Sequence, residues 1–397
     1  MTKNIAIKTL CIAIVMLGSV VQAGNVVQKA LDVGPTWSAH QTAPPLLYTS
    51  GGYQYVVYYD GNRKLRLAQR ELGSDKWLEH EFPVRTTWAT GGHALVALAV
   101  DIEGYVHVAP YRRALAEAPP APPSSIYYRT LRPHDLSSFE RMAMVDAGEP
   151  NPGYPRFITG HDGTLYFEYR KGRSGRGSQQ FNVYDQERQQ WETLPTLIDG
   201  QGRRSAYGGP RQGPDGRWHC FWVWRNTGAA ESTHTACYMV SDDLLQWQSA
   251  AGEAVELPVT VDNKQVVVDP VKPGEGLLNS IIGMGWDSRN RAVLSYHKYD
   301  ESGNSQIYVA RFQEDAWRIV QVTDWDFRWG FHGGGALGAR IRTGGVKPRP
   351  EGMLHLRVRS DWRGAEMIVL NEHTLAPVAD SGEQARGDAM PAWQRAY

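Results

Sequence analysis

The sequence predicts an all-β protein, and within that class a β-propeller with seven blades of four antiparallel strands. Short runs rich in Tyr, Val, Trp and Phe recur between clusters of Gly, Asp, Asn and Pro, and helical periodicity is nearly absent. The runs repeat as a pair of elements, an acidic turn that leads into a strand and then a closing hairpin. Radial repetition of four-stranded sheets explains this pattern, because each sheet buries both faces against its neighbours and leaves only short edges.

The first repeated element is the acidic turn with its following strand. It occurs as DIEGYVHVAP, HDGTLYFEYR, PDGRWHCFWVWR, WDSRNRAVLSYHKY and PEGMLHLRVR. The equivalent acidic residues are Asp101, Asp162, Asp215, Asp287 and Glu351, at spacings of 61, 53, 72 and 64 residues. A kelch or WD40 blade takes roughly 40 to 50 residues, so we predict long blades with insertions.

The second repeated element closes each unit. It occurs as LRLAQRELGSDKW, FNVYDQERQQW, CYMVSDDLLQW and YVARFQEDAW. We count six units between about Gly51 and Gly382, and predict that residues 24–45 and the C-terminal tail complete a seventh blade. The insert ALAEAPPAPPSS at 114–125 is too rich in proline for a ladder strand, so we expect an exposed loop there.

The first 23 residues have the layout of a secretory signal peptide. Two lysines precede an apolar stretch at 10–21, and a small-residue cleavage site follows at 21–23. No later stretch reaches the roughly 18 to 20 apolar residues of a membrane span. We therefore predict a secreted or periplasmic monomer without membrane attachment, in which residues 24–397 form one propeller domain.

The charge balance and the motif content exclude several function classes. Lys and Arg number 42, as do Asp and Glu, whereas nucleic acid or an anionic membrane requires a basic field. The sequence contains no P-loop, HExxH, GxSxG or metal-type CxxC motif, and GRSGRG at 172–177 lacks the Lys-Ser/Thr of a phosphate loop. We expect no cofactor for catalysis, and local arginines as the groups that bind an anionic ligand.

Four segments follow the pattern of one known family in the same order. They are GGHALVALAVDIEGYVHV, YPRFITGHDGTLYFEYRKGRSGRG, RWHCFWVWRNT and YHKYDESGNSQIYVARFQEDAWRIVQVTDWDFRWGFHGGG. From about Thr87 to Leu375, the chain resembles the propeller family that contains ulvan lyases and related uronate-cleaving polysaccharide lyases. The resemblance implies a secreted lyase that cleaves an ulvan-like, uronic-acid-containing polysaccharide by β-elimination and leaves 4,5-unsaturated uronate ends.

Such an elimination requires an enzyme to neutralise the uronate carboxylate, remove the C5 proton and protonate the leaving oxygen. Arginine suits the first task because its fork is permanently charged and bidentate. The resemblance implies that His93 and Tyr154 share the base and acid roles and that Arg170 binds the carboxylate. A tyrosine base would need Arg170 to lower its pKa. Alternatively, His93 is a structural strand residue, Tyr154 fills a gap between blades and Arg170 lies in a solvated loop.

One position departs from the family pattern. Family members often carry a second histidine beyond the equivalent of His107, where this chain has Tyr111-Arg112-Arg113. The departure speaks against a mechanism with two histidines. Arg113 instead offers a second cationic contact to a polyanionic chain.

Three further residues are candidates for binding sugar acids. Arg225 follows a Trp-rich strand, and His297 and Lys298 lie at the start of the longest family segment. We expect them to line the axial channel, although Lys298 could equally pair with Asp300 and hold a blade. The tryptophans expected in the blade core rather than as sugar platforms are Trp222, Trp224, Trp325 and Trp329.

His219, Cys220, His234 and Cys237 flank one predicted hairpin, and zinc favours ligands of these types. Residues 219 and 220 point to opposite faces of a strand, so they cannot easily serve one site. The resemblance implies a structural metal, zinc or calcium, near this segment, with His219 and His234 as candidate ligands. The alternatives are a Cys220–Cys237 disulfide or two buried free thiols.

Two other functions compete with the lyase. SDDLLQW at 241–247 is similar to the Asp-box turn of sialidase-like glycoside hydrolases, but the chain shows no recognisable three-arginine clamp with a Tyr-Glu nucleophile pair. A propeller that binds carbohydrate without catalysis is the second alternative. We predict the lyase, with an acidic polysaccharide as its partner.

Overall fold

The computed structural model describes residues 32–34, 46–86, 95–111, 126–145, 152–335 and 337–378. Within these ranges the chain is built from strands, and its helical segments are short 3-10 turns at Leu136–Ser138, Ala230–Ser232, Lys264–Val266 and Pro350–Gly352. No helix of this part of the chain has the length and apolar character to cross a membrane. The predicted all-β class is confirmed.

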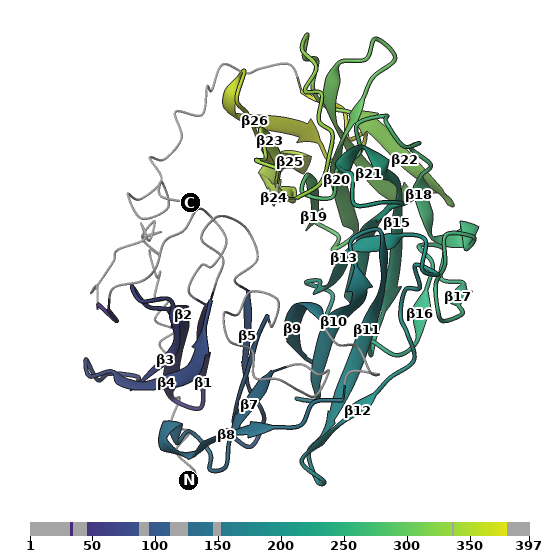
Figure 1. The fold of residues 1–397 in the computed structure, drawn as a ribbon. Coiled ribbons are helices and arrows are strands. Elements are labelled where there is room, and N and C mark those ends of the chain that lie inside the picture. Colours follow the sequence, from purple (N-terminus) through teal and green to yellow (C-terminus); the bar gives the residue numbers. More distant parts are fainter. Residues whose placement is uncertain are drawn as a thin grey trace, which may run out of the picture. The chain divides into compact units, whose positions relative to one another are not determined.

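The strands form six blade-like units in chain order (Figure 1). The first contains β1 (Leu46–Ser50), β2 (Tyr53–Tyr59), β3 (Lys64–Glu71) and β4 (Leu78–Arg85). The second contains β5 (Val96–Val100), β6 (Val106–Pro110), β7 (Tyr127–Thr130) and β8 (Phe139–Met142). The third contains β9 (Gly153–Thr159), β10 (Leu165–Arg173), β11 (Arg176–Asp185) and β12 (Gln190–Thr193).

The fourth unit contains β13 (Ser205–Gln212), β14 (Trp218–Arg225), β15 (Thr233–Ser241) and β16 (Trp247–Gln248), extended by β17 (Ala254–Val255) and β18 (Val267–Asp269). The fifth contains β19 (Ile282–Trp286), β20 (Ala292–Tyr299), β21 (Ser305–Gln313) and β22 (Ala316–Gln321). The sixth contains β23 (Ile341–Thr343), β24 (Lys347–Arg349), β25 (Met353–Ser360) and β26 (Gly364–Asn371).

Consecutive strands within the units pair antiparallel, apart from the sixth, where β23 and β24 both pair with β25. The parallel pair of Gly177 with Ser205 joins the third and fourth units into one ten-stranded sheet, and a parallel bridge between Ile198 and Val259 lies beside these strands. The predicted propeller of repeated four-stranded sheets is thus confirmed. The seventh blade stays a prediction, because most of residues 24–45 and the tail beyond 378 lie outside the described residues, as do the signal peptide and the insert at 114–125.

The acidic turns work as local strand initiators. The side chain of Asp60 accepts the backbone N–H of Lys64 at 3.0 Å, and Asp287 accepts that of Arg291 at 3.0 Å. Asp101 accepts the N–H of Tyr105 at 2.8 Å. Aspartate favours such turns because its carboxylate satisfies backbone donors a few residues ahead. The acidic residue of each turn therefore marks the point where the next strand begins, which is β3 after Asp60, β6 after Asp101 and β20 after Asp287.

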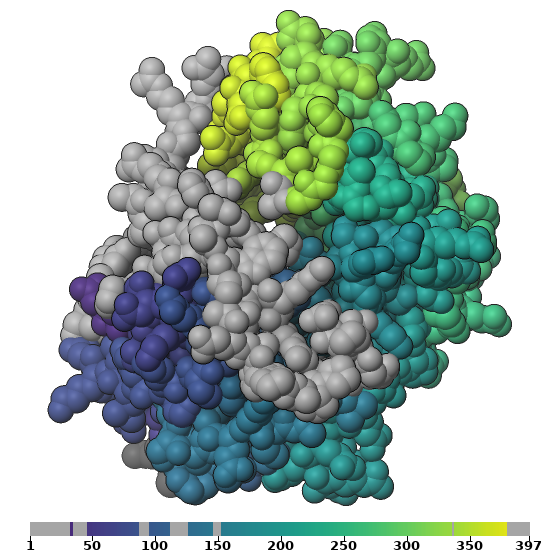
Figure 2. Space-filling view, viewed as in Figure 1, coloured from purple at the N-terminus to yellow at the C-terminus, as the bar shows by residue number. Residues whose placement is uncertain are grey.

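Apolar faces of neighbouring units pack against each other. One core cluster joins Phe82 of β4 to Val108 of β6 and Tyr128 of β7, and another joins Tyr127 to Phe167 of the third unit. The space-filling view in Figure 2 shows the blue and teal surfaces of the second and third units in contact. The tryptophans predicted as core are buried, namely Trp222, Trp224, Trp325 and Trp329. This packing accounts for their burial better than a sugar-stacking role.

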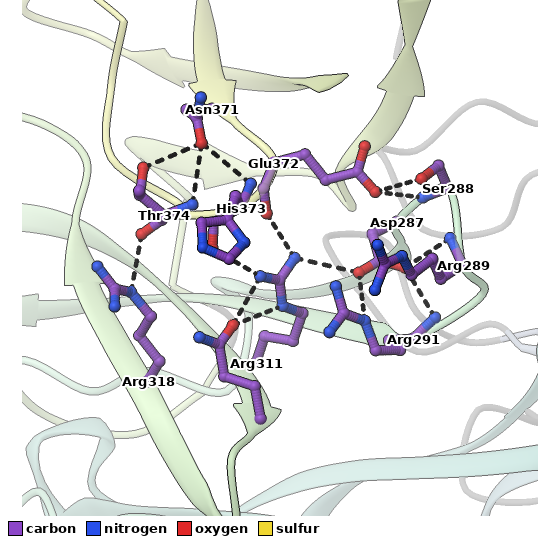
Figure 3. A network of polar contacts seen from close by, with 11 residues as sticks. Asp287, Ser288, Arg289, Arg291, Arg311, Arg318, Asn371, Glu372, His373 and Thr374 are labelled. Carbon is purple, nitrogen blue, oxygen red and sulfur yellow. Dashed lines mark hydrogen bonds and ion pairs between the residues drawn. The ribbon is translucent and has the colours of Figure 1, made fainter. Parts of the chain in front are cut away.

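A buried ion pair lies within the fifth unit, and its arginine also donates hydrogen bonds to the sixth unit (Figure 3). Arg311 on β21 is 1% exposed and contacts the carboxylate of Asp287, which is also 1% exposed, at 3.1 Å. The same guanidinium donates to the carbonyl oxygens of Glu372 at 2.7 Å and His373 at 3.0 Å, just beyond β26. Gln313 accepts from two of its other nitrogens. One side chain therefore satisfies polar groups of both units.

We expect Arg311→Ala to lower the free energy of unfolding by about 3 kcal/mol, because it leaves a buried carboxylate and two carbonyls without this donor. Arg318→Ala is the matched control, since this exposed arginine donates once to the Thr374 carbonyl at 2.8 Å. The control should cost less than about 1 kcal/mol. Urea denaturation of both variants measures the difference, and equal costs would contradict the role assigned to Arg311.

Candidate active site

Two of the predicted catalytic residues lie on adjacent strands of the third unit. Tyr154 stands at the start of β9, and Arg170 near the end of β10 is the register partner of Gly153, just past a β-bulge. Tyr154 has φ of 55°, a left-handed conformation that is uncommon for a bulky residue and costs on the order of 1 kcal/mol. The antiparallel pairing thus brings the start of one strand beside the end of the next.

The Arg170 guanidinium packs on the Tyr154 ring. Its carbon lies 4.7 Å from the ring centroid, and the arginine is only 7% exposed whereas Tyr154 is 36% exposed. Burial raises the pKa of the Tyr154 phenol above its ordinary value, and the Arg170 charge offsets only part of this shift. Arg170 thus lowers the pKa of Tyr154, as a tyrosine base would require, but burial outweighs this effect. A raised pKa means that the phenol keeps its proton at neutral pH.

Tyr207 of β13 is a site residue that the sequence reasoning missed. Its hydroxyl accepts a hydrogen bond from Nη1 of Arg170 at 3.2 Å, and its ring lies 5.8 Å from that guanidinium. The Arg225 guanidinium lies 5.6 Å from the same ring. Tyr207 therefore connects Arg170 with Arg225 across the junction of the third and fourth units. No local motif marks it, because its position depends on the pairing of two blades.

Arg225 joins the site through Tyr207 but is tightly held. It is 5% exposed and donates to the carbonyl oxygens of Ala229 at 3.0 Å and Gly228, and to Oδ1 of Asn279 at 3.3 Å. These partners place its charge beneath the Tyr207 ring. Arg225 can thus contribute a fixed positive charge to the site.

Tyr111 occupies part of the segment that departs from the family pattern. It is buried, and its ring stacks on Tyr154 at 6.1 Å between centroids. The rings of Tyr154 and Tyr207 also meet edge to face at 6.4 Å. The site is therefore lined by three tyrosines around Arg170. His93 and Arg113, predicted as a catalytic and a binding residue, lie outside the described residues, and their roles stay predictions.

The contacts described for His297 and Lys298 run to residues other than the tyrosines and arginines of this group. Nζ of Lys298 forms an ion pair with Asp269 at 2.6 Å and lies 4.4 Å from the Tyr308 ring centroid. The alternative partner Asp300 instead accepts from the Gln306 amide at 2.7 Å. His297 is fully buried, and its Nδ1 donates to the Gly276 carbonyl at 2.5 Å. The hydrogen bonds and ion pairs described for His297 and Lys298 are thus made with other residues of the propeller framework.

Burial lowers the pKa of His297 from its ordinary 6.5 to about 4. Between pH 4 and pH 6.5 this histidine binds a proton in the unfolded chain but not in the folded chain. The contribution of His297 to the free energy of unfolding is therefore fully present above pH 6.5 and is lost as the pH falls toward 4. The wild type should therefore lose up to roughly 3 kcal/mol more stability than His297→Gln between pH 7 and pH 4. Denaturant titrations of both proteins at several pH values test this, and parallel pH profiles would contradict it.

The two proposed metal ligands lie at opposite ends of one strand pair. His219 is on β14 and His234 pairs with Trp224, five residues further along that strand, which is roughly 17 Å. One ion cannot be bound by both histidines at that separation. The described residues also contain no cluster of three or more His, Cys, Asp or Glu side chains arranged for a metal. A structural metal stays a prediction without an identified ligand set.

Each of these histidines has protein partners instead. Nε2 of His219 donates to Asp215 at 3.0 Å and Nδ1 accepts from the Tyr238 hydroxyl at 2.5 Å. His107 repeats this arrangement with Asp101 and Tyr127 in the second unit. Burial lowers the pKa of His219, which keeps it neutral. The Asp-His-Tyr set is therefore a recurring brace of the blade.

His234 bonds to Asn226 at 2.9 Å and to the Thr235 hydroxyl at 2.9 Å, and burial lowers its pKa to about 4. Cys220 and Cys237 are free and buried. Their register partners are Met239 and Trp222, so the two thiols are not directly opposite. Burial raises the pKa of both thiols, which makes them poor nucleophiles. Of the alternatives considered, the structure has the two buried free thiols.

The segment that is similar to an Asp-box is a structural turn between β15 and β16. Asp243 accepts the backbone N–H groups of Leu245 and Gln246, both at 2.8 Å. The indole of Trp247 donates to the Leu244 carbonyl at 3.1 Å. The carboxylate is therefore occupied by the turn it forms.

The fold and the site together define a β-propeller with a cluster of arginine and tyrosine side chains at the junction of two blades. The chain belongs to the BNR repeat-containing family, whose profile matches residues 53–325. No curated protein matches the sequence.

The solved structures that share this fold include two polysaccharide lyases. The polysaccharide lyase Uly1 superimposes with a TM-score of 0.61 at 17% identity, covering 90% of this chain and 86% of its own. An ulvan lyase of polysaccharide lyase family PL25, bound to -[GlcA(1-4)Rha3S]-, gives 0.57 at 14% identity, covering 87% and 85%. At these identities the likeness shows the fold, and the similarity extends over most of each chain.

Proposed function

We propose that the protein is a secreted or periplasmic lyase that cleaves a uronic-acid-containing polysaccharide, of the ulvan type, by β-elimination. The observation that carries the proposal is the buried Arg170 guanidinium packed at 4.7 Å on the partly exposed Tyr154 ring. A permanent cation beside a neutral phenol supplies two of the three tasks of the reaction. The likeness in fold to polysaccharide lyases supports the same reaction class.

In the proposed reaction Arg170 binds the uronate carboxylate and stabilises the negative charge that develops on it as the C5 proton leaves. The electrons of the C5–H bond form the C4–C5 double bond, and the C4–O bond breaks. Tyr154 gives its proton to the leaving oxygen, a role suited to a phenol whose pKa is raised. His93, identified from the sequence resemblance, takes the C5 proton.

Digestion of a panel of uronate-containing polysaccharides tests this function. The expected result is ultraviolet absorbance from a 4,5-unsaturated uronate at each new non-reducing end, because elimination uses no water. Incubation in heavy-oxygen water provides the opposing readout. Label in the new ends without the chromophore would assign the protein to the hydrolases, and binding without any cleavage would make it a carbohydrate-binding propeller.

A further inference from the structure

A groove beside the candidate active site is lined by arginines. It has a volume of about 380 Å³ and is formed by the β10–β11 hairpin, the loop before β13 and the loop after β14. Arg173 and Arg176 come from the hairpin and Arg203 from the loop, and all three are exposed. Among the residues that the structure describes, no acidic side chain lines the groove. In the described part of the chain, none of the ion pairs involves these arginines.

Two of these arginines face each other directly. Arg173 and Arg176 are register partners across the hairpin, where like charges destabilise a strand pair. A nearby carboxylate would remove this cost, as it does for Arg156, whose register partner on the neighbouring strand is Glu168 and which forms an ion pair with it. The groove therefore concentrates positive charge that the described residues do not neutralise. A bound anion would neutralise it.

The walls of the groove are held by contacts of their own. The Ser205 hydroxyl donates to the Arg173 carbonyl at 3.1 Å, and the N–H of Gly177 donates to the Arg204 carbonyl at 3.0 Å. A Cβ atom on Gly175 would lie 2.4 Å from the backbone of Thr227, so the hairpin tip packs closely on the loop after β14. The arginines thus project from a fixed frame, which lowers the entropy cost of binding.

The groove also connects to Arg170, which binds the uronate carboxylate in the proposed reaction and is called the clamp below. Ser174 lines the groove, and its Oγ lies 2.5 Å from the Tyr207 hydroxyl. That hydroxyl accepts from Arg170. Tyr207 therefore lies between the groove arginines and Arg170. Two cationic regions placed side by side in this way can bind anionic groups on two neighbouring sugars of one polysaccharide chain.

We infer that the groove of Arg173, Arg176 and Arg203 is a second anion-binding subsite, which holds a carboxylate or sulfate ester on a sugar adjacent to the one in the clamp. The inference rests on the proposed function for its polysaccharide ligand. It makes the substrate a chain with more than one anionic sugar near the cleaved bond. A polymer with isolated uronates among neutral sugars would bind less well.

Calorimetric binding tests the subsite without relying on catalysis. The probes are polygalacturonate, which carries carboxylates only, dextran sulfate, which carries sulfate esters only, and neutral dextran. Substituting all three groove arginines by glutamine should weaken binding of at least one charged polymer by about tenfold or more, the effect of losing one charge-assisted contact. The polymer that responds identifies whether carboxylate, sulfate ester or both are recognised.

The matched control replaces Arg211, Arg357 and Arg359 by glutamine, since these are exposed arginines that change the net charge equally. Its binding should stay within about twofold of wild type. Equal losses in both triple variants, or no loss in the groove variant, would overturn the subsite. Thermal melting of the groove variant should not fall, because the Arg173–Arg176 repulsion is removed.

The two proposals fail separately. If no polysaccharide yields an unsaturated end but the groove variant alone loses binding, the lyase assignment fails and the subsite stands. If unsaturated ends form at the wild-type rate and KM in the groove variant, the subsite fails and the lyase stands.

Discussion

Tyr154→Phe and His93→Asn should each lower turnover by about 10² to 10⁴-fold, the usual contribution of a general acid or base. Phenylalanine keeps the ring that packs on Arg170 and Tyr111 and removes the hydroxyl group that would donate the proton. Polysaccharide binding should therefore survive. Initial rates of ultraviolet absorbance, with calorimetric binding alongside, measure both properties.

The double variant distinguishes one proton-transfer pair from two independent effects. If His93 and Tyr154 serve the same elimination, their losses should not add. Tyr308→Phe is the control, because it removes a hydroxyl bonded to Gln321 at 2.8 Å in the fifth unit. Near-normal rates in both single variants, with folding intact, would return Tyr154 to a gap-filling role and His93 to a structural one.

The assignment of Tyr154 as the acid also has a pH consequence. An acid must be protonated, so activity is present below its pKa and is lost as pH rises through it. Because the pKa of Tyr154 is raised above its ordinary 10.0, we expect no loss from this group below pH 10. A rate that rises with pH through a tyrosine ionisation would instead make Tyr154 the base.

Arg170→Lys should lower turnover by roughly 10²-fold or more, by analogy with the loss of one oxyanion donor. Lysine keeps the charge but offers a point contact in place of a planar fork. The variant would also lose the hydrogen bond from the guanidinium to the Tyr207 hydroxyl and the stacking of the guanidinium on the Tyr154 ring. Steady-state kinetics on a confirmed substrate give the effect on kcat and KM.

Arg211→Lys is the matched control for Arg170→Lys, because Arg211 is exposed near the far end of β13. It should leave turnover unchanged. The melting temperature of Arg170→Lys should stay close to wild type. A variant that keeps full turnover, or one that unfolds, would make Arg170 a structural residue.

Local chemistry explains why so much of the fold could be read from the sequence. An aspartate satisfies backbone donors within four residues, so each acidic turn marks a strand without help from the rest of the chain. Strand alternation and short hairpins are similarly local. The pairing of Tyr154 and Arg170 came from a family resemblance, and it is realised because their strands are consecutive and antiparallel.

Tertiary structure alone decided contacts between strands that are distant in sequence. Tyr207 reaches Arg170 only because two blades meet, and Lys298 pairs with Asp269, 29 residues away, rather than with nearby Asp300. Register placed His219 and His234 at opposite ends of β14 and β15, although they are close in sequence. Burial then decided the direction of the Tyr154 pKa, since it outweighs the Arg170 charge. Sequence by itself determined the repeated all-β architecture because turns and strand periodicity are local, whereas register, burial and blade packing set the partners of each side chain.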